Sequence, residues 1–213
     1  MTILETQGLA ARHAERVLAV AGTAQKNRAL EAIARALKER ESAILAENQK
    51  DLAAARESGM KASLLDRLAL SPQRIDGIVE GVRQVAALPD PIGCVTRMEK
   101  RPNGLVIGKR RVPLGVIGII YEARPNVTVD AAALCLKSGN AVILRGGKEA
   151  FRSNKAFVAV MRDALEAAGL PRDCVALVED TSRASAQELM GLTGYLDVLI
   201  PRGGAGLIRT VVE

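Results

Sequence analysis

The feature that most constrains this fold is a regular alternation of short apolar segments with amphipathic ones, which begins at Gly115. The apolar segments are too short for helices and end in turn-forming residues, so they read as buried strands. Strands that alternate with helices form right-handed βαβ units on a parallel sheet covered on both faces. The predicted strands are 115–120, 141–144, 174–178 and 198–200, and the predicted helices are 127–137, 153–168 and 182–192.

Before this region, residues 23–87 repeat apolar side chains at three- and four-residue spacing, which predicts successive amphipathic helices. Ser58-Gly59 interrupts one helix, Ser71-Pro72 begins another, and Leu88-Pro89-Asp90-Pro91 ends the series. The expected fold class is therefore α/β: a Rossmann-like sheet over residues 113–213 with an N-terminal helical part over residues 1–92.

Residues 93–112 separate these two parts and predict a β-hairpin. Alternating side chains flank Arg101-Pro102-Asn103-Gly104, where Asn-Gly supplies the positive φ of a hairpin turn. The second arm carries three adjacent cations, Lys109 to Arg111, which are typical of a solvated strand face or a protected edge. A phosphate-binding role for these cations is the alternative.

Composition excludes several classes of protein. With 48% hydrophobic and 25% charged residues, the chain has ordinary globular usage rather than the profile of a disordered protein. Its three cysteines show neither a disulfide framework nor a zinc-binding spacing, which favours a reducing cytoplasm. It shows no export leader and no apolar run of membrane-spanning length, so we expect no membrane association.

Candidate chemistry lies in the loops after the predicted strands, since open parallel sheets bind ligands outside the carboxyl ends of their strands. The loop Arg145-Gly146-Gly147-Lys148 contains two glycines, which allow a ligand to approach the backbone closely. It also contains two cations, which suit a phosphate group. Arg202-Gly203-Gly204 precedes a helix whose N-terminal amides suit a pyrophosphate. Plain turns with surface charges are the alternative at both loops.

The loop after the first strand contains Arg124-Pro125-Asn126. The carboxamide of Asn126 is a donor suited to an oxyanion, and it is equally suited to cap the next helix. His13 lacks a catalytic partner and is interpreted as a solvated helix residue, whereas Cys135 lies on an apolar helix face and is interpreted as an inert buried thiol.

Three long segments, 112–128, 137–150 and 197–208, together resemble the gamma-glutamyl phosphate reductases, a family of the aldehyde dehydrogenase superfamily. The helical opening is similar to the same family, so the resemblance covers essentially the whole chain. It implies that residues 93–112 form an oligomerisation hairpin of a homo-oligomer and that residues 113–213 bind NADPH.

By this resemblance, the reaction is the NADPH-dependent reduction of L-glutamate 5-phosphate to L-glutamate 5-semialdehyde and phosphate, in proline biosynthesis. Asn126 is the implied oxyanion donor and Arg124 an implied substrate contact. Arg145 stands where the superfamily has a lysine beside the adenosine ribose, and Arg145 with Lys148 suits the 2′-phosphate of NADP. The implied cofactor contacts are Arg145, Gly146, Gly147, Lys148, Arg202, Gly203 and Gly204.

The nucleophilic cysteine of that family belongs to a further catalytic domain, and neither Cys94, Cys135 nor Cys174 stands in its context. We therefore expect this chain to be the cofactor-binding part of the enzyme and to show no turnover by itself. The alternatives are a non-catalytic nucleotide-binding or assembly module and a basic nucleic-acid binder. The net charge of +6 fits a nucleic-acid binder, but four aromatic residues provide no stacking platform, so no nucleic-acid partner is expected.

Overall fold

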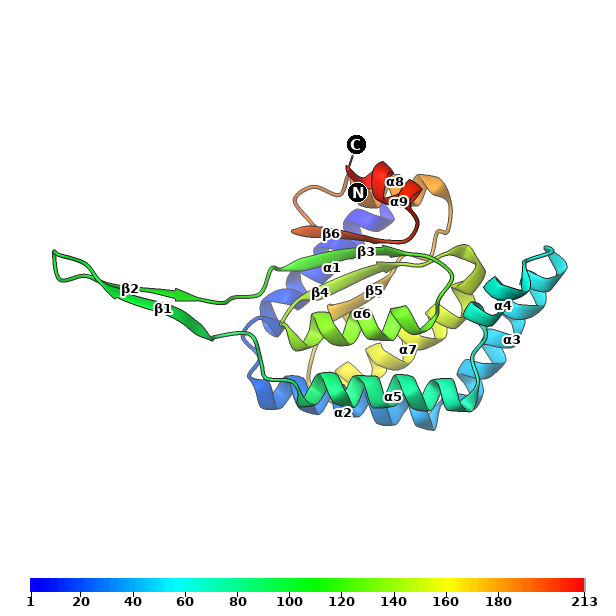
Figure 1. Ribbon diagram of the computed structural model, residues 1–213, viewed down its shortest axis with the longest axis horizontal. Coiled ribbons are helices and arrows are strands. Elements are labelled where there is room, and N and C mark those ends of the chain that lie inside the picture. The colour runs from blue at the N-terminus through cyan, green and yellow to red at the C-terminus, as the bar shows by residue number, and fades with distance from the viewer. Residues whose placement is uncertain (213) are drawn as a thin grey trace.

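The computed structural model describes residues 1–212 and has a four-stranded parallel sheet between layers of helices (Figure 1). In spatial order the strands are β5 (Val175–Leu177), β4 (Ala141–Arg145), β3 (Val116–Tyr121) and β6 (Val198–Arg202). Each neighbouring pair is parallel, which confirms the predicted α/β class. The chain runs outward from β3 to β5 and then returns to β6, so the order reverses beside β3, where such sheets open a ligand crevice.

Helices cover both faces of the sheet, and each face has its own apolar core. On one face lie α6 (Asn126–Lys137) and α7 (Phe151–Ala167), with α2 (Thr23–Glu39) and α5 (Pro72–Ala87) outside them (Figure 1). On the other lie α1 (Ile3–Leu18) and α8 (Arg183–Met190). All six residues of β3 are buried, as expected for the centre of a parallel sheet covered on both faces.

The helical series predicted over residues 23–87 is confirmed, with α3 (Glu41–Glu57) and the short α4 (Ala62–Leu68) between α2 and α5. Gly59, at a φ of +72°, follows α3, and the Ser71 side chain caps α5 by accepting from the Arg74 amide. Helix α1 lies in the helical part expected over residues 1–92, and His13 is an exposed residue of this helix, although its bounds were not predicted. Thr2 and Glu5 form a capping box at its start.

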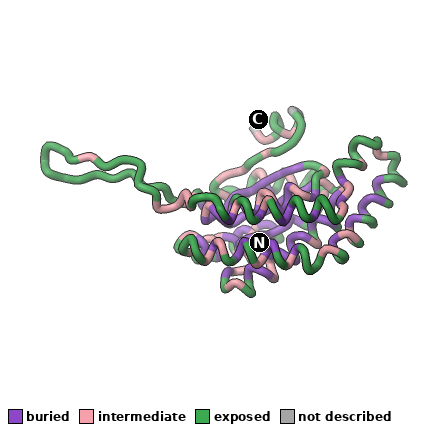
Figure 2. Tube along the Cα trace, turned by 60° about the horizontal axis from the view of Figure 1, so that its bottom comes forward, coloured by how far each residue is buried: buried purple, intermediate pink, exposed green. Residues whose placement is uncertain are grey.

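The predicted hairpin is confirmed as β1 (Val95–Lys100) paired antiparallel with β2 (Val106–Arg110). It projects from the body of the molecule (Figure 1), and its residues are almost all exposed (Figure 2). The expected positive φ of the Asn-Gly pair is confined to Gly104, at +87°. Asn103 contributes instead through its side chain, which accepts a hydrogen bond from the Leu105 amide.

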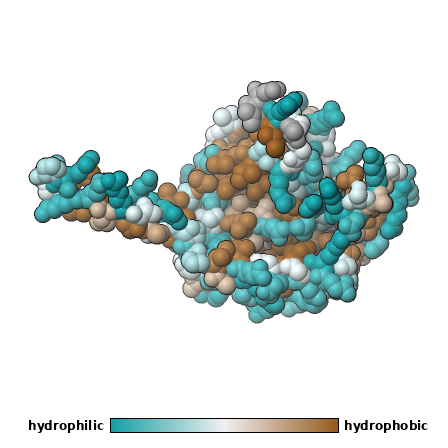
Figure 3. Space-filling view, viewed as in Figure 1, coloured by the Kyte–Doolittle hydropathy of each residue, from teal (hydrophilic) through white to brown (hydrophobic). Residues whose placement is uncertain are grey.

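Strand β6 is an edge of the sheet, and its burial is incomplete. Ile200 is 42% exposed, and apolar side chains gather on the surface around this strand (Figure 3). The last described helix, α9 (Ala205–Val212), follows β6 directly. Among residues 1–212, no helix combines the length and apolar character needed to cross a membrane.

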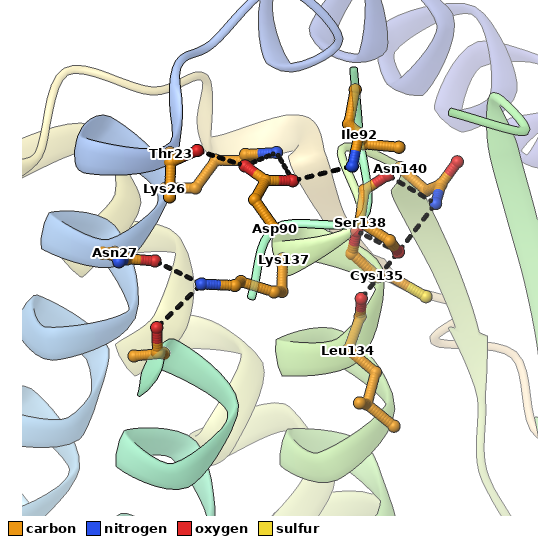
Figure 4. A network of polar contacts seen from close by, with 11 residues as sticks. Thr23, Lys26, Asn27, Asp90, Ile92, Leu134, Cys135, Lys137, Ser138 and Asn140 are labelled. Carbon is orange, nitrogen blue, oxygen red and sulfur yellow. Dashed lines mark hydrogen bonds and ion pairs between the residues drawn. The ribbon is translucent and has the colours of Figure 1, made fainter. Parts of the chain in front are cut away.

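A buried polar network joins the helical layer to the root of the hairpin (Figure 4). The Asp90 carboxylate accepts from the Lys26 ammonium, the Thr23 hydroxyl and the Ile92 amide. Lys26 is only 2% exposed, so this pair lies largely out of water. Nearby, the buried Lys137 ammonium donates to the Asn27 side chain and the Ala86 carbonyl. The network fixes the direction in which the chain leaves α5 for the hairpin.

This network makes the folding stability of the chain depend on pH in the acidic range. Burial raises the pKa of Asp90, but the hydrogen bonds from Lys26, Thr23 and Ile92 outweigh it and hold that pKa below its ordinary value of 3.8. A group whose pKa is lower in the folded than in the unfolded chain stabilises the fold at pH values above its unfolded pKa. That stabilisation is lost as pH falls through the folded pKa. We expect Asp90→Asn to cost about 1–2 kcal/mol at pH 7. In urea unfolding, the difference in free energy of unfolding between Asp90→Asn and wild type should shrink below about pH 4.

The matched control is Asp76→Asn, because Asp76 pairs with Lys38 while 57% of its side chain is exposed. Exposed pairs contribute roughly 0–1 kcal/mol, so the control should remain close to wild type. An Asp90→Asn deficit that stayed constant down to pH 3 would show that the Asp90 charge is not its source.

Candidate functional site

The carboxyl ends of β3, β4 and β5 open into a cleft of about 870 Å³. The loops after these strands form its walls, and the starts of α8 and α9 close two sides. Its volume lies within the roughly 300–1,000 Å³ typical of small-ligand sites. Lining residues include Met60, Leu64, Tyr121, Glu122, Arg145, Gly147, Lys148, Glu149, Asp180, Thr181, Ser182, Arg183 and Leu207.

Arg145 bridges two of the loops that form the cleft. Its guanidinium donates to the backbone carbonyls of Thr181 (2.8 Å) and Ser182 (2.9 Å), which precede α8. Its Nε atom is buried and has no hydrogen-bond partner among residues 1–212. Lys148 and Arg183 line the same cleft and are exposed. Arg145 therefore braces the cleft, and the exposed cations beside it are accessible to an anionic ligand.

The two glycines after Arg145 meet different surroundings. Gly146 is buried, and a Cβ there would lie 2.2 Å from Asn154 Nδ2 and 3.1 Å from the Tyr121 ring. Gly147 lines the cleft, and a Cβ there would lie 2.7 Å from a Glu149 carboxylate oxygen. The missing side chain of Gly146 thus permits internal packing, whereas that of Gly147 keeps the cleft wall open.

The glycine turn at the start of α9 already contacts a carboxylate. The Gly204 amide donates to Glu122 Oε1 at 3.0 Å, and a Cβ on Gly203 would lie 2.7 Å from that oxygen. Glu122 lies one residue after β3, so the topology of the sheet brings it to the turn. A helix N-terminus favours negative charge, so an incoming phosphate would compete with Glu122 for this amide. Sequence reasoning did not single out Glu122.

Asn126 is the first residue of α6 rather than its cap, because Pro125 occupies the capping position and offers no side-chain hydrogen bond. The Asn126 carboxamide instead donates to Asp130 Oδ2 at 3.0 Å. Burial raises the pKa of Asp130, partly offset by this hydrogen bond and by the charge of Arg202. Arg124 lies exposed at the rim and shares a smaller pocket with Asn126. The alternative of Asn126 as a helix cap is therefore wrong.

The cysteines lie away from the cleft. Cys135 and Cys174 are buried, and burial raises the pKa of each thiol to about 12. Cys94 is exposed at the root of the hairpin. A thiol must ionise to act as a nucleophile, so the two buried cysteines are inert at neutral pH. Among residues 1–212, no group of histidine, cysteine or carboxylate side chains is arranged to hold a metal ion.

Comparison with known proteins gives consistent matches. The model of the aldehyde dehydrogenase family matches residues 2–195. The chain is 60% identical over 210 residues to a gamma-glutamyl phosphate reductase from Moorella thermoacetica, covering 99% of this chain and 50% of that protein. The chain thus spans about half the length of the curated relatives it matches.

Two solved structures with the same name have a similar fold. The gamma-glutamyl phosphate reductase from Thermotoga maritima superposes with a TM-score of 0.97 at 46% identity, over 99% of this chain and 51% of that one. Its counterpart from Saccharomyces cerevisiae gives a TM-score of 0.91 at 32% identity, over 99% and 54%.

Proposed function

The chain belongs to the aldehyde dehydrogenase family, and from this membership we propose that it provides the cofactor-binding part of a gamma-glutamyl phosphate reductase. The whole reaction is then the NADPH-dependent reduction of L-glutamate 5-phosphate to L-glutamate 5-semialdehyde and phosphate. The observation that carries the proposal is the cationic cleft at the strand ends, which shares Glu122 with a neighbouring hollow lined by Gly203 of the glycine turn before α9.

The residues of this cleft suit the anionic groups of NADPH. Lys148 and Arg183 are exposed cations that line the cleft together with Arg145. We assign these cations to the 2′-phosphate and adenosine end. The Gly203–Gly204 turn suits the pyrophosphate, which would replace the Glu122 carboxylate at the start of α9. Gly146, Gly147 and Arg202 complete the proposed contacts, Gly146 by allowing the loop to pack.

In the proposed chemistry, bound NADPH supplies the hydride. The contribution of this chain is to hold that cofactor and to position the acyl phosphate beside it. Asn126 would donate its carboxamide to the oxygen that gains negative charge, while its bond to Asp130 fixes the amide orientation. Arg124, exposed at the rim, would contact the substrate.

The hairpin is proposed to join copies of the chain into a homo-oligomer. Val95, Met98 and Ile107 are apolar and between 46% and 62% exposed on this arm. Its backbone edges also offer unpaired groups to a neighbouring strand. An arm that projects from the body without covering its own core is suited to reach a second subunit.

The thiol chemistry of such a reductase gives a direct test. We expect this chain to bind NADPH yet give no steady NADP⁺ reduction with L-glutamate 5-semialdehyde and phosphate. The reason is that Cys135 and Cys174 are buried with raised pKa values and Cys94 lies at the hairpin root. A thiol reagent followed by mass spectrometry should label Cys94 in the folded chain and reach the others only after unfolding.

Nucleotide binding is read separately, by fluorescence titration of NADPH against a buffer control. Steady turnover that disappears on changing any one of the three cysteines would contradict the expected lack of activity. Failure of a demonstrably folded chain to bind NADPH would remove the proposed cofactor role.

A further inference from the structure

A second pocket, of about 350 Å³, lies beside the main cleft between the α4–α5 corner and the loop after β3. Arg67 of α4 and Arg124 of the loop both line it, with Asn126 at the start of α6. Both arginine side chains are exposed, and neither has a hydrogen bond or ion pair to any of residues 1–212. Two guanidiniums without protein partners therefore face one small pocket.

The same pocket also contains a carboxylate whose position is fixed. Arg74 donates to Asp66 Oδ1 at 2.7 Å and to the backbone carbonyls of Asp66 and Ala69. Arg74 thereby braces the corner between α4 and α5. The second carboxylate oxygen of Asp66 makes no hydrogen bond to any of residues 1–212, and the Asp66 side chain is 73% exposed. The pocket thus presents two unpaired cations and one available carboxylate oxygen.

We propose that this pocket binds the α-amino-acid end of the substrate, an inference that rests on the proposed function. Arg67 and Arg124 bind the α-carboxylate, and Asp66 binds the α-ammonium. A guanidinium pairs well with a carboxylate, because its planar donors match the two oxygens. The other oxygen of Asp66 adds an acceptor for an ammonium group, which a zwitterion carries and a phosphate lacks.

The position of the pocket is consistent with the chemistry proposed above. Asn126, the proposed oxyanion donor, lines the same pocket, so one end of a glutamyl chain would be bound while the other reaches the reacting position. Arg67 and Arg124 also line a neighbouring hollow with Tyr121 and Gly203, at the ends of β3 and β6. The pocket therefore adjoins the strand-end region where the cofactor is proposed to lie.

The test is an amide chemical-shift titration of the ¹⁵N-labelled chain with L-glutamate, glutarate and inorganic phosphate. L-Glutamate should shift the amides of residues 66, 67, 124 and 126, with glutarate binding more weakly because it lacks the ammonium. Arg67→Ala and Arg124→Ala should each weaken L-glutamate binding about tenfold or more. Asp66→Asn should weaken L-glutamate binding without weakening glutarate binding, because glutarate has no ammonium to lose a partner.

The matched control is Arg35→Ala, an exposed arginine of α2 that lines neither pocket and should bind L-glutamate like wild type. Phosphate that binds at these residues as tightly as L-glutamate would overturn the proposal, and so would the absence of any L-glutamate response up to its solubility limit. A separate NADPH titration distinguishes the two failures. NADPH binding without an L-glutamate response removes only this pocket, whereas a folded chain that binds no NADPH removes the proposed function.

Discussion

Replacing Gly146 by alanine is expected to lower the free energy of unfolding by about 3 kcal/mol, because a methyl group inserted into a packed interior forces its neighbours apart. The new Cβ would lie 2.2 Å from Asn154 Nδ2, and Asn154 is only 1% exposed. Asn154 cannot easily move, since its Oδ1 accepts from Thr128, which also bonds to the Tyr121 hydroxyl. Urea unfolding followed by circular dichroism measures the change.

The same substitution elsewhere provides the control. Gly81 lies inside α5, and a Cβ there would meet nothing within 4 Å. Alanine at such a helical position is expected to raise stability by up to about 1 kcal/mol, because glycine loses more backbone entropy on folding. The two variants should therefore change stability in opposite directions. A Gly146→Ala protein as stable as wild type would show that the loop moves freely and that its packing does not require glycine.

The sequence predicted the fold well where local patterns determine structure. Each apolar run from Gly115 onward became a strand of one parallel sheet, and cap and glycine signals located the ends of α3 and α5. Boundaries shifted where a side chain has a mixed character. The strand predicted over 115–120 stops before Tyr121, yet Tyr121 ends β3 with its ring buried and its hydroxyl hydrogen-bonded to Thr128.

The site was harder to predict, because its contacts join residues that are distant in sequence. The strand-end rule located the four loops, but the carbonyl partners of Arg145 come from a loop 36 and 37 residues later. Glu122 reaches the Gly204 amide across 82 residues. Arg67, on a short helix outside the sheet, joins Arg124 in a pocket only through tertiary packing. The residue types indicated suitable chemistry. The fold determined which of these side chains already form hydrogen bonds or ion pairs within the chain.

The contact between Arg145 and the loop before α8 gives the other prediction with a large effect. Arg145→Ala is expected to weaken NADPH binding about tenfold to a hundredfold, as removal of a charged hydrogen-bonding partner costs roughly 1.5–3 kcal/mol. Two causes combine: the positive charge near the 2′-phosphate is lost, and Thr181 and Ser182 lose the donor that holds their carbonyls. Fluorescence titrations of the variant with NADPH and with NADH measure both effects.

Comparison of the two nucleotides separates charge from bracing, because NADH lacks the 2′-phosphate. If Arg145 acts through its charge, NADPH binding falls more than NADH binding; if it acts only as a brace, both fall equally. Lys148→Ala is the matched control, since Lys148 lines the same cleft but its side chain forms no hydrogen bond or ion pair with residues 1–212. The loss of the Lys148 side chain should weaken the binding of NADPH but not that of NADH, and by less than Arg145→Ala does. Unchanged binding of both nucleotides in Arg145→Ala would remove Arg145 from the cofactor site, and an equal loss of both would leave Lys148 and Arg183 to recognise the 2′-phosphate.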